Sequence, residues 1–488
     1  MTSKSTTPSK RLFARSPAKW SPHNYQRKAV KWLLEHAAAA LFLDPGLGKT
    51  SVTLAAFSFL KKRKVASKAL VIAPLRVCHG VWPQEAEDWK DFNHLRVVVL
   101  HGPHKEELLH SDADVYCINP EGLEWLVYGK GGTIFNAKRW KALGFDTLVI
   151  DELTKFKHPK GVRFKALKTV LGTFARRWGL TGTPAANGLL DLFGQCFVLD
   201  EGNALGRYIT HYRMTYFINP DRQGWKWLPK PGAKELIYEK LKPLALRMAA
   251  ADYLELPELV DTFTLLDLPA RARKLYDQLE EDLLAKIDEG VIVAANGAAA
   301  SIKLRQICNG GLYVDDDVLS IIGGKERQTL EIHDVKTQWL QELVEELQGA
   351  PLLVAYEFKH DLERLQKAFG KDLPYIGGGV TGAKGKAHED AWNRGDYTVM
   401  AVHPASAGHG INLQHGQACH LAHYSMTWDF DQYDQLVKRI LRQGNKSARV
   451  LRYHAVMRET VDQDMRFALA GKNKGQQALF AALAARKR

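Results

Sequence analysis

The sequence contains few cysteines and no long apolar segment. Its five cysteines are scattered over 488 residues without a Cys-x-x-Cys pair, which argues against a zinc module or a disulfide framework and favours a reducing compartment. No apolar run approaches the ~18 residues of a membrane span. The N-terminal segment also lacks the apolar stretch of a secretory signal, so we expect a cytoplasmic protein.

Acidic residues are outnumbered: 54 Asp and Glu face 68 Lys and Arg, for a net charge of +14. This excess favours a polyanionic partner only modestly, because solubility alone is a sufficient reason for it. Residues 1–20 are predicted to be a basic disordered arm, and the tail 466–488 is basic without one acidic residue. These two ends are interpreted equally well as solvated termini or as salt-sensitive contacts to a polyanion.

Apolar runs alternate with helix-like segments in two parts of the chain, which predicts an α/β protein with two parallel-sheet cores in tandem. The predicted limits are 21–201 and 331–465, with a mainly helical insertion at 202–330. The runs that we interpret as strands are 39–43, 69–74, 95–102, 113–120 and 146–152 in the first part, and 351–357, 397–404, 418–425 and 449–456 in the second.

A glycine-rich turn separates the first of these runs from a helical pattern, in "LFLDPGLGKTSVTL". Gly46 and Gly48 let backbone N–H groups approach phosphate oxygens, and the helix N-terminus adds its positive end. Lys49 would then reach the β- and γ-phosphates of ATP, and the Thr50 hydroxyl would ligate Mg²⁺. The match to the strict phosphate-loop pattern is incomplete, because Leu43 stands where that pattern has glycine.

A pair of carboxylates follows the strand-like run "DTLVI". The run delivers Asp151 and Glu152 to the carboxyl edge of a parallel sheet, where α/β proteins bind ligands. In a nucleoside triphosphatase the aspartate holds Mg²⁺ and the glutamate polarises the attacking water. Together with Gly-Lys-Thr upstream, this pair predicts a triphosphatase.

Several further segments resemble the motifs of the Swi/Snf-type DNA translocases, a family of superfamily-two helicases. "LTGTPAANGLLDLF" resembles motif III, "APLRVCHGVWPQEAEDW" motif Ia, "SAGHGINL" motif V and "YDQLVKRILRQGN" motif VI. "HNYQRKAV" resembles the adenine-reading segment, and "LRQICNGG" a run found before the second core. The motifs cover residues 21–465 in family order, and the compact length is more typical of bacterial or phage members.

The resemblance implies two RecA-like cores with ATP between them, and it assigns roles to residues of both. Arg439 and Arg442 would stabilise the charge that develops on the γ-phosphate. Gln26, Gly410 and Gln435 would bind the nucleotide. The residues that it implies in DNA contact or in coupling to hydrolysis are Thr154, Thr181, Gly182, Thr183 and Ser406.

The implied function is ATP-driven translocation on double-stranded DNA, with branched or single-stranded DNA as further partners. Thr154 departs from the family's usual histidine, so coupling could differ. A strand-separating DNA or RNA helicase and a DNA-binding scaffold with a degenerate ATPase therefore stay open as alternatives. Retention of Lys49, Asp151, Glu152 and both arginines argues against the scaffold.

Aromatic and histidine clusters have plainer interpretations. Trp82 and Trp89 have near-helical spacing, so we expect core packing rather than base stacking. The segment 221–231 is basic and aromatic, and a packed loop is favoured over a DNA wedge. Histidines near motif V show no metal-ligand spacing.

Overall fold

The computed structural model describes residues 17–182, 184–185, 188–220, 227–254, 256–288, 294–313, 329–380, 382–407, 411–415, 419–427 and 429–470. The chain forms two compact units, the first from residues 1–43, 47–181 and 193–247 and the second from 44–46, 182–192 and 248–488. The predictions for Thr183 and Gly410, for 221–226 and for most of both terminal segments lie outside the described residues.

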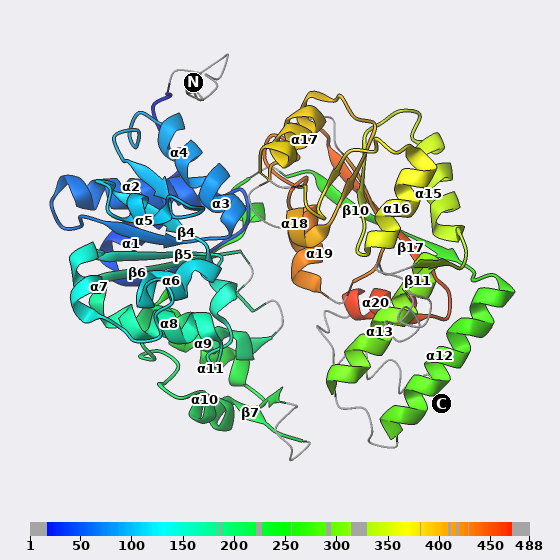
Figure 1. The fold of residues 1–488 in the computed structure, drawn as a ribbon, viewed down its shortest axis with the longest axis horizontal. Helices are drawn as coiled ribbons and strands as arrows, with labels where there is room; N and C mark the ends of the chain where they lie inside the picture. Colours follow the sequence, from blue (N-terminus) through cyan, green and yellow to red (C-terminus); the bar gives the residue numbers. More distant parts are fainter. Residues whose placement is uncertain are drawn as a thin grey trace, which may run out of the picture. The chain divides into compact units, whose positions relative to one another are not determined.

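Seven strands form the sheet of the first unit, in the order β3-β4-β2-β5-β6-β1-β9 (Figure 1). The strands from β3 to β1 pair in parallel, as the continuous apolar runs predicted. Their bounds are β1 (Ala38–Leu43), β2 (Ala69–Ile72), β3 (Val97–Val99), β4 (Val115–Ile118), β5 (Thr147–Asp151), β6 (Arg176–Thr181) and β9 (Ala245–Met248). All five strands predicted in this part of the sequence are confirmed.

The strand β6 was not predicted, although it is central to the sheet. Its sequence, RRWGLT, begins with two arginines, so it lacks the continuous apolar run of a buried strand. Arg177 uses its guanidinium to donate to the backbone carbonyls of Leu199 (2.6 Å) and Leu171 (3.0 Å). Its guanidinium thus satisfies backbone carbonyls near the start of the strand, and the last four residues of β6 are buried.

Helices lie on both sides of these strands in Figure 1, as a doubly wound sheet requires. The α-helices up to residue 241 are α1 (Asn24–Glu35), α2 (Lys49–Lys62), α3 (Leu75–Gly80), α4 (Trp82–Asp88), α5 (Lys105–Leu109), α6 (Leu123–Tyr128), α7 (Ala137–Leu143), α8 (Val162–Val170), α9 (Leu192–Asp200), α10 (Ile209–Tyr216) and α11 (Ala233–Leu241). Short 3-10 turns are η1 (Pro120–Gly122), η2 (Leu153–Phe156), η3 (Leu171–Thr173), η4 (Leu189–Asp191) and η5 (Ala250–Asp252).

The second unit is built on a six-stranded parallel sheet, ordered β10-β17-β16-β13-β15-β14. The strands are β10 (Glu258–Leu266), β13 (Leu352–Ala355), β14 (Tyr375–Ile376), β15 (Val399–Val402), β16 (His420–His423) and β17 (Arg449–Met457). The four strands predicted in this part are confirmed. Sequence patterns missed β10, which mixes polar and apolar residues and has no fully buried position, and β14, which has two residues.

Alternate residues of β13 separate the two faces of this sheet. Leu353 and Ala355 pack into a cluster with α17 (Gly382–Arg394) and α19 (Phe430–Val437). Leu352 and Val354 face the opposite cluster, with α15 (Val335–Glu346) and α16 (Lys359–Phe369). Both faces are therefore covered, which is why the strands read as unbroken apolar runs.

Residues 202–330 were predicted to be a mainly helical insertion. Their described part holds α10, α11, α12 (Ala270–Asp288) and α13 (Ala294–Asn309), but it also contributes β9 to the first sheet and β10 to the second. Short antiparallel pairs are formed by β7 (Phe217–Ile218) with β8 (Leu228–Pro229) and by β11 (Gly311–Tyr313) with β12 (Thr329–Glu331). The predicted domain limits stay a prediction.

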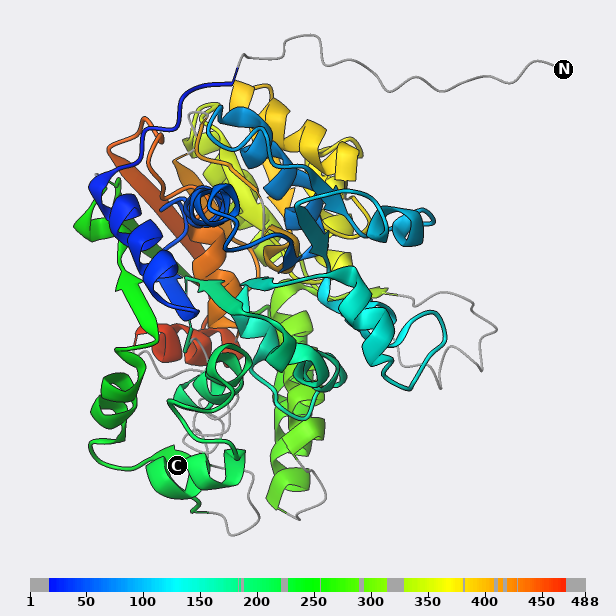
Figure 2. The same ribbon diagram turned by 90° about the vertical axis from the view of Figure 1, so that its left-hand side faces the viewer.

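A buried polar network attaches α13 to the second sheet (Figure 2 shows α12 and α13 in side view). Arg305 donates to the Met426 carbonyl (2.8 Å), and Asn309 donates to Asp361 (3.1 Å). Arg305 and Asn309 both belong to the "LRQICNGG" run. This run therefore secures the helix to the core.

The network continues to α20 (Val461–Ala470). The short helix α18 (Pro404–Ala407) follows β15. Lys336 Nζ, fully buried, lies 2.7 Å from Asp462 and donates to Asn309 Oδ1 at 2.8 Å. A buried charge with these partners is stable only while the partners stay in place. Among the described residues, no helix is long and apolar enough to cross a membrane.

We expect Lys336→Ala to destabilise the second unit by about 3–5 kcal/mol, because Asp462 would keep its charge in the core without its ammonium partner. Urea unfolding combined with amide hydrogen exchange over α15 would measure the change. The matched control is Lys359→Ala, which removes an exposed pair with Glu363 and is expected to cost less than ~0.5 kcal/mol. Equal effects of the two substitutions would contradict the structural role given to the buried pair of Lys336 and Asp462.

Candidate ATP and magnesium site

The phosphate loop, the carboxylate pair and motif III all lie at the carboxyl edge of the first sheet. β6 lies between β1 and β5, and all three run parallel. Phe42 in β1 is level with Thr181 in β6, and Leu180 is level with Asp151 in β5. With about 4.8 Å between neighbouring strands, the phosphate loop and the carboxylate pair leave the sheet roughly 10 Å apart.

The loop after β1 has the backbone of a phosphate-binding turn. Gly46 (φ 93°) and Gly48 (φ 73°) both adopt left-handed conformations, which glycine reaches without strain. α2 begins at Lys49, whose Nζ donates to the Leu43 carbonyl at 2.7 Å. The ammonium therefore lies across the loop that joins β1 to α2.

Gln26 ties the start of α1 to this loop. It is buried, with 8% of its surface exposed; its Oε1 accepts from His23 N (2.9 Å) and its Nε2 donates to the Leu47 carbonyl (3.4 Å). A Cβ added at Gly48 would lie 2.5 Å from Gln26 Nε2. The side chain predicted to read adenine is thus packed against the second glycine of the loop.

The oxygen ligands available here suit Mg²⁺. Thr50 presents a hydroxyl from the first turn of α2, and Asp151 presents a carboxylate from the end of β5. Mg²⁺ prefers hard oxygen donors, usually one or two protein groups completed by water and phosphate oxygens. The residues present therefore fit a magnesium–nucleotide complex. Within the described part of the chain, no cluster of three or more His, Cys, Asp or Glu residues suggests another metal site.

Glu152 has a strained backbone and a fixed side chain. Its φ of 73° is unusual for a residue with a Cβ and is of the kind that persists at functional sites. Thr154 Oγ1 donates to Glu152 Oε1 at 2.6 Å, and Thr181 Oγ1 donates to the same oxygen at 3.3 Å. The threonine that replaces the family's histidine thus contacts the predicted catalytic glutamate, as does a motif III hydroxyl.

Trp82 was predicted to be core packing, and with 1% exposure it is. The sequence did not indicate its second contact: Trp82 Nε1 donates to Asp151 Oδ2 at 3.0 Å. Burial, and next the charge of Asp151, raise the pKa of the neighbouring Cys78 thiol to about 12. Cys78 is therefore a packing residue, not a nucleophile.

The second unit brings motifs V and VI together. Arg442 Nη1 donates to Asn412 Oδ1 at 2.6 Å, and the backbone N–H of Leu413 donates to the Arg439 carbonyl. Burial, followed by the charge of Arg439, lowers the pKa of Arg442 below its usual range. Two neighbouring positive charges suit an anionic ligand, and the contact between Asn412 and Arg442 was not indicated by the sequence analysis.

The other predicted residues of this unit are placed as follows. Gln435 is buried in α19, and Ser406 lies in α18. Gly182 directly follows β6 and belongs, by compactness, to the second unit. The structure brings together Gln26 and the phosphate loop, the Glu152 cluster, and the Asn412–Arg442 pair; the remaining roles stay predictions.

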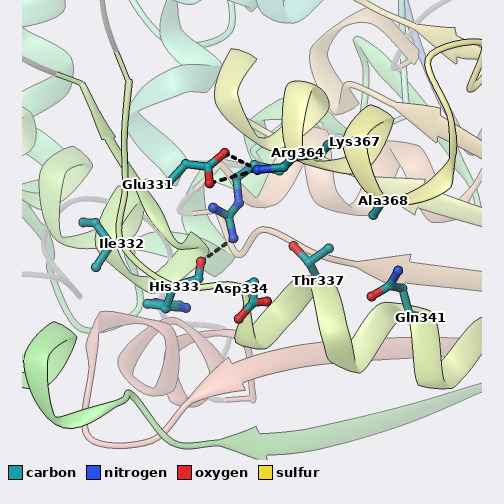
Figure 3. A pocket seen from close by; sticks show the side chains of 9 residues that line it. All are labelled: Glu331, Ile332, His333, Asp334, Thr337, Gln341, Arg364, Lys367 and Ala368. Atoms are coloured by element: carbon teal, nitrogen blue, oxygen red, sulfur yellow. Dashed lines mark hydrogen bonds and ion pairs between the residues drawn. The ribbon is translucent and has the colours of Figure 1, made fainter.

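A cavity of about 420 Å³ lies elsewhere in the second unit, between β12, α15 and α16 (Figure 3). Three of its charged groups already have partners: Lys367 Nζ is 3.0 Å from Glu331, and Arg364 donates to the backbone carbonyls of His333 and Gly310. None of the predicted site residues lines it. It is separate from the chemistry described above.

Comparison with protein families gives two consecutive matches. The SNF2-related domain matches residues 25–311, and the helicase conserved C-terminal domain matches residues 335–444. Putative protein p41 of Acyrthosiphon pisum secondary endosymbiont phage 1 is 35% identical over 462 residues, which are 91% of this chain and 94% of that protein.

More distant similarity extends to larger proteins and to solved structures. An uncharacterized ATP-dependent helicase of Mycoplasma genitalium is 28% identical over 308 residues, 60% of this chain and 27% of that protein, so the chain spans about a quarter of its length. The Sulfolobus solfataricus SWI2/SNF2 ATPase core in complex with dsDNA is 23% identical, with 94% of this chain and 93% of that chain covered and a TM-score of 0.43.

We expect Gly48→Ala to weaken nucleotide binding by roughly tenfold, because an alanine at positive φ costs about 1–2 kcal/mol and its Cβ would displace Gln26. Equilibrium titration with a fluorescent nucleotide would measure this. Gly80→Ala is the control, since a Cβ there meets nothing within 4 Å. Unchanged affinity in Gly48→Ala would show that the nucleotide does not use this loop.

Proposed function

The chain belongs to the SNF2-related family of DNA-dependent ATPases, and on that basis we propose that it moves along double-stranded DNA by hydrolysing ATP. The observation that carries the proposal is the convergence of the phosphate loop (motif I), the segment from Asp151 to Thr154 (motif II) and motif III at the carboxyl ends of β1, β5 and β6. Motion would remodel protein–DNA contacts or branched DNA, without separating the strands. Phosphate contacts suit this task because they position a protein without reading sequence.

In this proposal the first unit binds and polarises the triphosphate. Lys49 contacts the β- and γ-phosphates, and Thr50 and Asp151 hold Mg²⁺. The bound Mg²⁺ would neutralise charge on the phosphate oxygens. Glu152, whose Oε1 accepts from both threonine hydroxyls, would orient the attacking water.

The second unit supplies positive charge to the transition state. Arg439 and Arg442 would act on the γ-phosphate, a contribution that is typically ~10³–10⁵ in rate for such arginines. The Asn412 contact fixes the guanidinium of Arg442 and reduces the freedom that it loses on engaging an anion. Gln26, Gly46, Gly48, Gly410 and Gln435 complete the proposed nucleotide contacts.

Coupling between DNA and hydrolysis would pass through Glu152. Thr181, Gly182 and Thr183 form motif III, and Ser406 begins motif V, both proposed DNA-contacting segments. Since Thr181 shares one carboxylate oxygen with Thr154, any shift of motif III on DNA would alter the hydrogen bonding of the glutamate. Thr154 then does the work usually assigned to histidine at that position.

Steady-state ATP hydrolysis with duplex DNA, single-stranded DNA, RNA or no nucleic acid tests the proposal. We expect the strongest stimulation by duplex DNA and none in Lys49→Ala, which removes the phosphate-loop ammonium. Displacement of a triplex-forming strand would then report translocation, while an intact duplex would report that strands are not separated. Stimulation by single strands or RNA alone would favour a strand-separating helicase, and absence of hydrolysis would favour a scaffold.

Thr154→Val keeps the shape of the side chain and removes its hydroxyl. We expect DNA-stimulated hydrolysis to fall by roughly tenfold, equivalent to ~1.4 kcal/mol, with a smaller change in the basal rate. The control is Thr169→Val in α8, where the hydroxyl donates to the Lys165 carbonyl of its own helix. Equal losses in basal and stimulated rates would assign Thr154 to chemistry and not to coupling.

A further inference from the structure

We propose that Trp82 is a positioning residue for the divalent cation: its indole N–H holds Oδ2 of Asp151 and so fixes the orientation in which the carboxylate meets the metal. The inference rests on the proposed function only in taking Asp151 as a magnesium ligand. It assigns to the first tryptophan of motif Ia a role in the chemistry of motif II, in addition to its packing.

The contact joins a buried donor to a half-buried carboxylate. Trp82 is 1% exposed, and its Nε1 lies 3.0 Å from Asp151 Oδ2, within the normal range for a hydrogen bond to a carboxylate. Trp82 is the first residue of α4, and Asp151 is the last residue of β5. The bond therefore joins two elements that are 69 residues apart in the sequence.

The hydrogen bond from Trp82 restricts the orientation of the Asp151 carboxylate. An indole N–H is a hydrogen-bond donor only, so it cannot itself coordinate Mg²⁺. Once Oδ2 accepts this bond, rotation about the last side-chain bond of Asp151 is limited. Partners that orient a metal ligand in this way typically account for 10–100-fold in metal affinity or activity.

Other buried tryptophans show that packing alone does not require this arrangement. A buried indole needs an acceptor, and Trp178 and Trp392 use the backbone carbonyls of His36 and Leu413. Trp82 instead uses a carboxylate at the site edge of the sheet. Trp89 provides the matched comparison, because its Nε1 donates to Glu85 Oε2 at the same 3.0 Å, away from motif II.

The experiment measures cation binding independently of turnover. Mn²⁺ would be titrated into the full-length protein with a non-hydrolysable ATP analogue, and free Mn²⁺ followed by electron paramagnetic resonance. We expect Trp82→Phe to weaken Mn²⁺ binding by about tenfold or more, and Trp89→Phe to leave it unchanged. Equal Mn²⁺ affinities in wild type and Trp82→Phe would overturn the proposal.

A second variant separates the hydrogen bond from packing. The five-membered ring of indole and the imidazole ring attach in the same way, so His Nε2–H in Trp82→His would take the place of the indole N–H. Histidine fills less space than phenylalanine, so loss of packing predicts a weaker site in Trp82→His than in Trp82→Phe. The proposal predicts the reverse order, and thermal melting of each variant reports folding.

The outcomes also distinguish this inference from the proposed function. Wild type that binds Mn²⁺ with the analogue but shows no DNA-stimulated hydrolysis would contradict translocation and leave the role of Trp82 testable. DNA-stimulated hydrolysis with unchanged Mn²⁺ affinity in Trp82→Phe would contradict the role of Trp82 alone. A tighter Mn²⁺ site in Trp82→Phe would also overturn the inference, because the bond would then restrain Asp151 from the metal.

Discussion

The parallel pairing of β1, β6 and β5 is the constraint on which the candidate site depends. It places the end of each strand at the same edge, so that a loop of glycines, a pair of carboxylates and a threonine emerge side by side. Helix α2 contributes its N-terminus there because Gly48 makes the turn that starts it. A slip in the register between β6 and β5 would separate Thr181 from Glu152 and dismantle the cluster.

Each member of the carboxylate pair is held by a different motif. Asp151 accepts from the tryptophan of motif Ia, and Glu152 accepts from threonines of motifs II and III. Asp151 and Glu152 are consecutive residues, yet they are hydrogen-bonded to separate parts of the chain. In the second unit, the same principle joins motif V to motif VI through Asn412 and Arg442. Side-chain hydrogen bonds, more than backbone proximity, define which motifs act together.

The sequence predicted most of the sheet strands because parallel strands covered on both faces are continuously apolar. It missed strands whose polar side chains are satisfied by other contacts, and strands that lie at the edge of a sheet. The arginines of β6 interrupt its apolar pattern. β9 lies at the sheet edge within the predicted helical insertion, where Ala40 N donates to the Leu244 carbonyl (2.7 Å).

The motif residues of the candidate site could be proposed from the sequence, because the residues of one motif lie close together along the chain. The orienting contacts were not, because they depend on side-chain direction across distant segments. Trp82 was correctly placed in the core, yet no pattern in the sequence shows that its N–H meets Asp151. Asn412 lies in a recognised motif, but its pairing with Arg442 appears only once the second sheet is folded.

The left-handed backbone of Glu152 sets stability against activity at a single position. Glycine would adopt a φ of 73° without the strain that a Cβ brings, so the folded chain would gain by the exchange. A search that selects only for heat resistance would therefore be drawn to glycine at residue 152 and would return proteins without their proposed catalytic carboxylate. Stabilised versions of this ATPase should be sought elsewhere in the chain, with residue 152 held constant.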